Sequence, residues 1–223
     1  MIKGKIAEVF LSIQGEGIYA GERQIFVRFF GCNLQCVFCD TELTTYEKFS
    51  SVQLFNKIED YKANIHSVSF TGGEPLLQID FLKEIARLVK NQGMKTYLET
   101  NGTLPEAFCE VSNDIDFVAM DIKFPSFTGE RSFWQEHKDF LISALDKDVF
   151  VKTVICESTT QEDVECAFDL VARVDSSIPF VLQPNFFEQE NLEKKLEELR
   201  HLGEEYLADV RIIGQQHKVM GVR

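Results

Sequence analysis

Short apolar runs rich in β-branched and aromatic residues alternate with longer amphipathic stretches along the 223-residue chain. The short runs predict six strands, at Ile25–Phe30, Ser67–Thr71, Lys95–Thr100, Phe117–Lys123, Val149–Ile155 and Phe180–Gln183. The amphipathic stretches predict five helices, at Val52–Lys62, Phe81–Asn91, Phe133–Leu145, Thr160–Val174 and Asn191–Tyr206. Because each strand is followed by a helix that returns the chain, the alternation predicts a parallel sheet with right-handed crossovers.

Six strands are too few for a complete eight-stranded barrel. We therefore predict an α/β fold built as a partial, open barrel of the (β/α)6 type, with residues 1–223 forming a single domain. In the last helix, Leu192, Leu196, Leu199 and Leu202 recur at helical spacing, which predicts core packing. Gly93 lies just beyond a predicted helix, where a C-cap glycine is expected.

The composition restricts the class of function. A hydrophobic content of 44% with 20 Phe is ample for a large core, and no apolar run approaches the roughly 18 residues of a membrane span. A formal net charge of −13 argues against a nucleic-acid partner, since phosphate contacts need clustered Lys and Arg. Met1–Lys5 does not resemble the start of a signal peptide. We expect a cytoplasmic protein that acts on small molecules.

Three of the six cysteines, Cys32, Cys36 and Cys39, are spaced C-x3-C-x2-C. Three thiolates can hold three irons of a [4Fe-4S] cluster and leave the fourth iron open to a small molecule. The alternatives are a zinc site with a distant fourth ligand and a disulfide framework, and the spacing and compartment favour neither. The other cysteines lie in apolar stretches and are predicted to be small core residues: Cys109, Cys156 and Cys166.

Polar residues follow several predicted strands directly. Thr71-Gly72-Gly73-Glu74-Pro75 ends one strand, where two glycines permit close backbone approach to a ligand and Glu74 offers an acceptor for an ammonium. Glu99–Gly102, Asp121–Lys123 and Gln183–Asn185 end three others. Each alone is ordinary turn chemistry. Because parallel strands end at one rim, their regular placement favours a shared ligand site.

The N-terminal region adds two features. Gln14-Gly15-Glu16-Gly17 offers planar donors and acceptors beside backbone amides, or else forms a glycine-rich turn. Arg28 alternates with Phe26 and Phe30, so the three side chains share one strand face. An Arg among aromatic residues needs an anion, which is either a ligand carboxylate or an internal Asp or Glu.

The cysteine spacing resembles that of the radical S-adenosylmethionine (SAM) enzymes. The longer pattern resembles the 7-carboxy-7-deazaguanine synthases over nearly the whole chain, through Glu8–Gly17, Phe26–Leu34, Cys39-Asp40-Thr41, Thr71–Pro75, Glu99–Gly102, Leu182–Pro184 and Gln216–Arg223. Asp121-Ile122-Lys123 matches the family loosely. The resemblance implies a partial, open (β/α)6-type radical SAM barrel with N- and C-terminal extensions that are specific to the family. It also implies that SAM is cleaved reductively to a 5′-deoxyadenosyl radical. The radical takes a hydrogen from C6 of 6-carboxy-5,6,7,8-tetrahydropterin, and ring contraction with loss of ammonia gives 7-carboxy-7-deazaguanine.

The resemblance also implies residue roles. Cys32, Cys36 and Cys39 would hold the cluster, and Thr41 would bind Mg²⁺. SAM would contact Phe38, Cys39, Asp40, Gly72, Gly73, Glu74, Gly102, Asp121, Lys123, Gln183, Pro184 and Asn185. The pterin would contact Ile13, Gln14, Gly15, Glu16, Arg28, Thr100, His217 and the terminal carboxylate of Arg223.

The same resemblance implies a flavodoxin or ferredoxin as external electron donor, and a homodimer. Two rival functions remain. A radical SAM activase that makes a glycyl radical on a partner protein would share the cluster but need no pterin pocket. A zinc-containing interaction domain would use the cysteines structurally. The other histidines are expected at the surface: His66, His137 and His201.

Overall fold

Nine strands form one sheet in the computed structural model, which describes residues 2–36, 39 and 43–221. Their order across the sheet is β3-β1-β2-β4-β5-β6-β7-β8-β9. The strands are β1 (Lys3–Ile13), β2 (Arg23–Phe29), β3 (Glu47–Ser50), β4 (Ser67–Gly72), β5 (Thr96–Thr100), β6 (Phe117–Asp121), β7 (Asp148–Ile155), β8 (Phe180–Pro184) and β9 (Val210–Ile212).

The sheet is mostly parallel and does not close. β1 pairs antiparallel with both β2 and β3, whereas every pair from β2 to β9 is parallel. β3 and β9 are the two edges in the part of the chain that the structure describes. The predicted open, partial barrel is confirmed, with an antiparallel extension at one edge.

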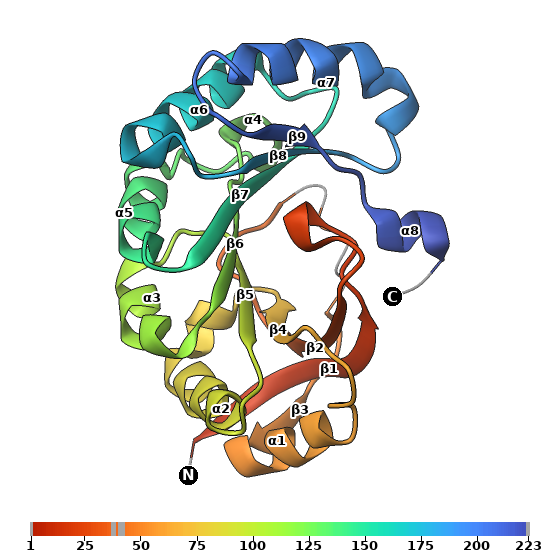
Figure 1. The fold of residues 1–223 in the computed structure, drawn as a ribbon, viewed down its shortest axis with the longest axis vertical. Coiled ribbons are helices and arrows are strands. Elements are labelled where there is room, and N and C mark those ends of the chain that lie inside the picture. The colour runs from red at the N-terminus through yellow and green to blue at the C-terminus, as the bar shows by residue number, and fades with distance from the viewer. Residues whose placement is uncertain (1, 37–38, 40–42, 222–223) are drawn as a thin grey trace.

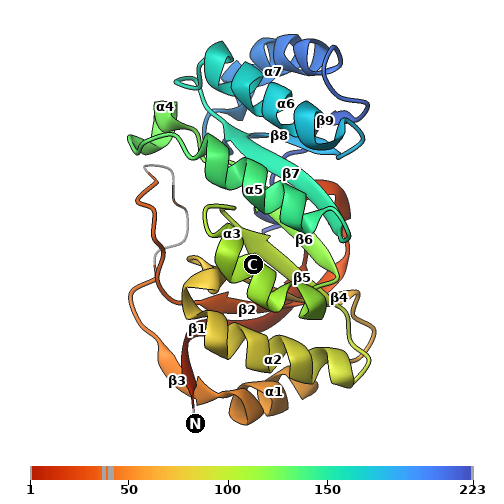
Figure 2. The ribbon, with the colours of Figure 1, turned by 90° about the vertical axis from the view of Figure 1, so that its left-hand side faces the viewer.

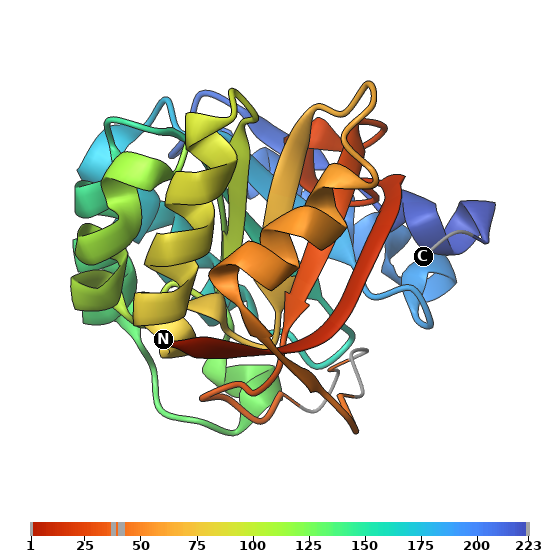
Figure 3. The same cartoon turned by 90° about the horizontal axis from the view of Figure 1, so that it is seen from below.

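Helices cover one face of the curved sheet (Figures 1 and 2). The larger ones are α1 (Ser51–Glu59), α2 (Ile79–Asn91), α3 (Pro105–Val111), α5 (Trp134–Ala144), α6 (Gln161–Asp175) and α7 (Gln189–Gly203). Short segments are η1 (Gly17–Tyr19), η2 (Pro75–Gln78), η3 (Ser112–Asp114), α4 (Pro125–Thr128) and α8 (Gln216–Met220). The view from below separates α2 and α3 on one side of the strands from α8 on the other (Figure 3). None of the described helices is long and apolar enough to cross a membrane.

Two clusters of buried apolar side chains stabilise this arrangement. The larger one fills the space between the helices and the sheet and includes the predicted leucines Leu192, Leu196 and Leu199, each no more than 4% exposed. The smaller one fills one end of the barrel interior and consists of Tyr97, Phe117, Ala119, Phe150 and Val181. These five residues, called the barrel floor below, lie on successive strands β5 to β8, so the interior at that end is packed with side chains.

Most predicted elements are present with shifted ends. All six predicted strands and all five predicted helices form, and Gly93 follows α2 with φ +75° as expected for a C-cap glycine. The prediction of six strands is nevertheless incomplete because β1, β3 and β9 were not predicted. β3 is a polar edge strand and β9 has three residues, so neither carries a clear alternating pattern.

Three predicted positions are wrong. Cys109 and Cys166 are exposed rather than in the core, because they lie on the outward faces of α3 and α6. His137 is fully buried rather than at the surface, and its Nε2 lies 3.1 Å from the backbone oxygen of Asn101. Cys156 is buried as predicted, and His201 is exposed as predicted.

Candidate active site

A cavity of about 820 Å³ opens at the carboxyl ends of the parallel strands. Its wall is a layer of polar side chains, one from each of five successive strands. On each strand the polar residue lies two positions after a residue that faces inward deeper in the barrel, so both side chains are on the same face of the sheet. The members of this layer are Thr71 on β4, Glu99 on β5, Asp121 on β6, Lys152 on β7 and Gln183 on β8. The barrel interior therefore changes from an apolar floor to a polar wall within one strand period.

The three cysteines line the same cavity from the connection between β2 and β3. Leu34 N donates to Cys32 Sγ at 3.4 Å, and Cys39 N donates to the backbone oxygen of Cys36 at 3.1 Å. Burial raises the pKa of the Cys32 thiol, and it raises that of Cys36 to about 11. Because a metal binds the thiolate, loading the site must displace these protons.

The donor set suits an iron–sulfur cluster better than a single ion. No group of three His, Cys, Asp or Glu side chains among the described residues converges on one point that a metal ion could occupy. In a cubane, each cysteine binds its own iron, so the sulfurs surround the cluster instead of meeting at a point. Cys32, Cys36 and Cys39 all line one cavity, as three ligands of such a cluster would.

Gly72 and Gly73, at the end of β4, pack against the backbone that leads from β2 into the cysteine loop. A Cβ at Gly72, where φ is +119°, would lie 2.4 Å from the backbone oxygen of Phe29, and one at Gly73 would lie 1.9 Å from that of Gly31. Gly73 N and Glu74 N donate to the same two oxygens at 2.9 and 2.8 Å. The glycines thus permit backbone packing against the loop as well as lining the cavity.

Glu74 lies behind the cavity wall. Its fully buried carboxylate accepts hydrogen bonds from Leu76 N at 3.0 Å, from Thr100 Oγ1 at 3.0 Å and from Asn101 N at 2.8 Å. Burial raises the pKa of Glu74 to about 7, against the lowering effect of these hydrogen bonds. A cation at the cavity wall would favour its ionised form.

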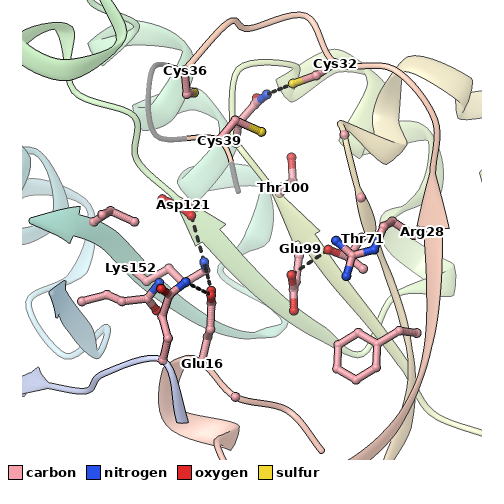
Figure 4. Close-up of a pocket in the computed structure, with 18 of the residues that line it drawn as sticks. Glu16, Arg28, Cys32, Cys36, Cys39, Thr71, Glu99, Thr100, Asp121 and Lys152 are labelled. Atoms are coloured by element: carbon pink, nitrogen blue, oxygen red, sulfur yellow. Dashed lines mark hydrogen bonds and ion pairs between the residues drawn. The ribbon is translucent and has the colours of Figure 1, made fainter. Parts of the chain in front are cut away.

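Both carboxylate oxygens of Glu16 have a polar partner, and its contact with Lys152 is drawn in Figure 4. Lys152 Nζ lies 2.6 Å from Glu16 Oε2, and Gln215 Nε2 donates to Glu16 Oε1 at 2.7 Å. Burial acts to raise the pKa of Glu16, but the Lys152 ammonium and these hydrogen bonds outweigh it and hold the pKa well below its usual range. Glu16 is therefore an ionised acceptor at the cavity wall.

Asp121 and Lys123 continue this charged network toward the cysteines. Asp121 Oδ2 accepts from Lys152 Nζ and from Lys123 Nζ, each at 2.8 Å. Asp121 Oδ1 is buried and has no hydrogen-bond partner among the described residues. Burial acts to lower the pKa of both ammonium groups. The Asp121 carboxylate outweighs burial and raises the pKa of Lys123, and Asp121 with Glu16 and Glu99 raises that of Lys152.

Glu99, a member of the polar layer, binds the segment that follows β1. Gln14 Nε2 donates to Glu99 Oε1 at 2.7 Å, and Thr71 Oγ1 donates to Glu99 Oε2 at 2.7 Å (Figure 4). Gln14 Oε1 in turn accepts from Glu16 N at 3.0 Å. These bonds fix the Gln14–Glu16 segment against the barrel.

Arg28 lines the cavity with Phe10, Phe26 and Phe30, and its guanidinium carbon lies 5.5 Å from the centroid of the Phe10 ring. Its Nε also lies 3.3 Å from Glu8 Oε2, and the two residues are register partners on β2 and β1. The internal carboxylate that the sequence allowed is therefore present as Glu8, and Arg28 also lines the cavity.

The C-terminal segment returns to the N-terminal one. Gln216 N donates to the backbone oxygen of Gly15 at 2.9 Å, and a Cβ at Gly15 would lie 2.1 Å from His217 Nδ1. His217 lines the cavity as a result, although it lies 202 positions after Gly15 in the sequence. The absence of a side chain at Gly15 provides the space that the His217 imidazole occupies.

Most of the predicted site residues meet at this cavity. The predicted residues that line it are Ile13, Gln14, Gly15, Glu16, Arg28, Cys32, Cys36, Cys39, Gly72, Gly73, Thr100, Asp121, Lys123, Gln183, Asn185 and His217. Glu74, Gly102 and Pro184 do not line it. Phe38, Asp40, Thr41 and Arg223 lie outside the described residues.

The sequence interpretation missed Lys152, Gln215 and the role of Glu99. Lys152 had a usable signal, since it is a lone charge within the apolar run Val149–Ile155 and a buried Lys needs a partner. Gln215 carried no such signal.

Comparison with known proteins identifies the family. Residues 26–156, more than half of the chain, match the Radical SAM superfamily. Among the similar curated proteins are the 7-carboxy-7-deazaguanine synthases of Geobacter sulfurreducens (36% identical, covering 97% of each chain), Archaeoglobus fulgidus (35%, 100% of each) and Methanocaldococcus jannaschii (34%, 97% of this chain and 99% of the other).

A solved structure agrees in fold. The crystal structure of QueE from Escherichia coli matches with a TM-score of 0.67 over 96% of this chain and 95% of that one, at 21% identity. The chain belongs to the radical SAM superfamily and, within it, to the family of 7-carboxy-7-deazaguanine synthases.

Proposed function

We propose that this protein converts 6-carboxy-5,6,7,8-tetrahydropterin to 7-carboxy-7-deazaguanine as a radical SAM enzyme of one domain, residues 1–223. The observation that carries the proposal is that one cavity brings together the three cysteines with Gln14, Glu16, Arg28 and His217. The family relatives named for this activity support it over the activase. An activase would need the cysteines but not Gln14, Glu16, Arg28 or His217.

In this proposal, Cys32, Cys36 and Cys39 hold the [4Fe-4S] cluster. When bound, the cluster and SAM supply the 5′-deoxyadenosyl radical that removes the substrate hydrogen. Gly72, Gly73, Asp121, Lys123, Gln183 and Asn185 contact SAM along the strand ends. Glu74 acts from behind the wall, where its carboxylate orients Thr100 and Asn101 through hydrogen bonds.

The pterin lies against the opposite wall. Glu16 accepts hydrogen bonds from ring N–H groups, because its carboxylate is ionised and fixed by Lys152 and Gln215. Arg28 faces the substrate carboxylate, and His217 contacts the ring from the C-terminal side. The apolar faces of Phe10 and Phe26 line the same part of the cavity and exclude water from it.

The remaining expectations belong to the same proposal. Thr41 binds Mg²⁺, and the terminal carboxylate of Arg223 contacts the pterin. A flavodoxin or ferredoxin supplies the electron, and the enzyme works as a cytoplasmic homodimer without nucleic-acid or membrane partners. The acidic net charge of −13 supports the absence of nucleic acid.

Anaerobic incubation of reconstituted protein with SAM, reductant, Mg²⁺ and the carboxytetrahydropterin tests the function by mass analysis. We expect formation of 7-carboxy-7-deazaguanine together with 5′-deoxyadenosine. The exposed Cys109→Ala and Cys166→Ala variants should retain iron and turnover, whereas Cys32→Ala, Cys36→Ala and Cys39→Ala should lose both.

The controls separate the rivals. SAM cleavage without pterin conversion would contradict the proposal and favour the activase. A colourless zinc protein would contradict the radical SAM chemistry altogether.

A further inference from the structure

Lys152 is a lysine in the interior of the barrel. It lies on β7 two residues beyond Phe150 of the barrel floor, and its side chain is 7% exposed. Burying an ammonium in an apolar interior costs several kcal/mol unless it is paired, so a lysine there requires partners. Its partners come from different parts of the chain, Glu16 from the N-terminal loop and Asp121 from β6.

The two carboxylates lie on opposite sides of the Lys152 ammonium. Glu16 Oε2 is 2.6 Å from Nζ, and Asp121 Oδ2 is 2.8 Å from it. Each carboxylate also has a second polar partner, since Gln215 bonds Glu16 Oε1 and Lys123 bonds Asp121 Oδ2. The result is a continuous series of charge-assisted contacts across the cavity wall, which runs from Gln215 through Lys152 to Lys123.

Lys152 lies at the centre of this series of contacts, between the Glu16 side and the Asp121 side. On one side, Glu16 joins Gln215 and the C-terminal segment that carries His217. On the other, Asp121 joins Lys123, at the wall that also holds Cys36. Asp121 Oδ1 keeps unused acceptor capacity, because it is buried and has no hydrogen-bond partner among the described residues.

Without the lysine, two carboxylates would face one another across a cavity that also contains Glu99. Removing one partner of a buried ion pair leaves an uncompensated charge, which moves away or takes a proton. Either change would remove the ionised, oriented acceptors that the site presents to its ligands. Any effect of Lys152 on a bound molecule would therefore pass through Glu16 and Asp121.

We propose that Lys152 is a positioning residue that orients Glu16 toward the pterin and Asp121 toward SAM, so that both ligands depend on one buried ammonium through different carboxylates. The assignment of the two ligands rests on the proposed function. The placement of Lys152 between the carboxylates does not.

Double-mutant cycles on the cluster-loaded protein test this inference. SAM and pterin affinities are measured anaerobically by calorimetry for Lys152→Met alone and combined with Glu16→Gln or Asp121→Asn. We expect Lys152→Met to weaken both ligands by about tenfold or more. In the Glu16→Gln background, Lys152→Met should change pterin affinity by less than about twofold. In the Asp121→Asn background, Lys152→Met should change SAM affinity by less than about twofold.

Lys152→Arg is the matched control, because it keeps the charge with a different geometry. It should recover part of both affinities, and if Lys152→Met loses its cluster, the same cycles are measured with Lys152→Arg. Effects that add fully in both backgrounds would overturn the proposal and leave Lys152 as a structural ion pair. Conversion of the pterin by the wild type is measured first. If it fails, the proposed function fails, while the SAM cycle still tests Lys152.

Discussion

Asn101 Nδ2 donates a hydrogen bond to Asn33 Oδ1 at 2.9 Å and thereby joins the end of β5 to the cysteine loop. The bond belongs to a small ring of contacts. Asn33 Nδ2 donates to Thr103 Oγ1 at 2.8 Å, and Thr103 Oγ1 donates to Asn101 Oδ1 at 2.7 Å. Asn33 follows Cys32 directly, so the ring limits the movement of the first cysteine.

We expect Asn101→Ala to weaken retention of the cluster. The substitution leaves the amide of Asn33 with one partner fewer in a part-buried site, which costs about 1–3 kcal/mol. Iron release to a chelator under anaerobic conditions should accelerate about fivefold or more, which corresponds to roughly 1 kcal/mol. Asn113→Ala, at an exposed position, is the control and should release iron at the wild-type rate. Equal rates for the two variants would contradict a role of the ring in holding the loop.

His137 gives the protein a specific sensitivity to acid. Its Nε2 donates to the backbone oxygen of Asn101, and its Nδ1 is buried without a hydrogen-bond partner among the described residues, as in a neutral imidazole. Burial lowers the pKa of His137 to about 4, against the raising effect of the Asn101 contact. In the unfolded chain the imidazole takes a proton near its ordinary pKa of about 6.5.

Between these two values the unfolded state binds a proton that the folded state does not. The free energy of unfolding should therefore fall as the pH falls from about 6.5 toward 4, by about 3 kcal/mol from this residue. Urea unfolding of cluster-free protein at several pH values checks the prediction. His137→Gln keeps a side-chain donor but cannot titrate, so it should lose this part of the pH dependence. An identical pH dependence in both proteins would show that His137 is not responsible.

Arg28 and Glu8 allow a paired test of substrate binding. Arg28→Ala should weaken the carboxytetrahydropterin by about tenfold or more, or roughly 1.4 kcal/mol, while leaving SAM affinity within about twofold. Glu8→Gln removes the internal carboxylate 3.3 Å from Arg28 Nε and should leave pterin binding intact or strengthen it. Calorimetry with both ligands distinguishes an Arg28 that binds the substrate from one that is only structural. Equal loss of both affinities in Arg28→Ala would make Arg28 structural.

The sequence predicts most of the fold because the barrel strands and helices have strong, local patterns. Val149–Ile155 is mostly apolar, and α2 has an apolar stripe, so both are predicted from their own residues. β1 is different, because its side chains alternate poorly and it is stabilised by antiparallel pairing with β2 and β3. Such pairing depends on partners elsewhere in the chain, which a local pattern does not contain.

The same distinction holds for the site. Cysteine spacing and the glycine pair at Gly72 and Gly73 are local and were predicted. The Lys152–Glu16 contact joins residues 136 apart, and the bond from Gln215 to Glu16 joins residues 199 apart. Pairings of this kind depend on the assembled barrel, so the sequence indicates at most that a buried lysine needs a carboxylate.

Gly15 offers a test of how the C-terminal segment completes the cavity. Its backbone oxygen accepts from Gln216 N, and a Cβ at this position would lie 2.1 Å from His217 Nδ1 and 2.6 Å from His217 Cβ. Gly15→Ala must therefore displace His217. If His217 contacts the pterin, the variant should bind the pterin about tenfold more weakly and bind SAM as the wild type does. Gly214→Ala is the matched control, since its Cβ would meet the protein at an ordinary 3.8 Å from Pro184 Cγ. Wild-type pterin affinity in Gly15→Ala would remove His217 from the substrate site and leave the cavity wall to Glu16 and Arg28.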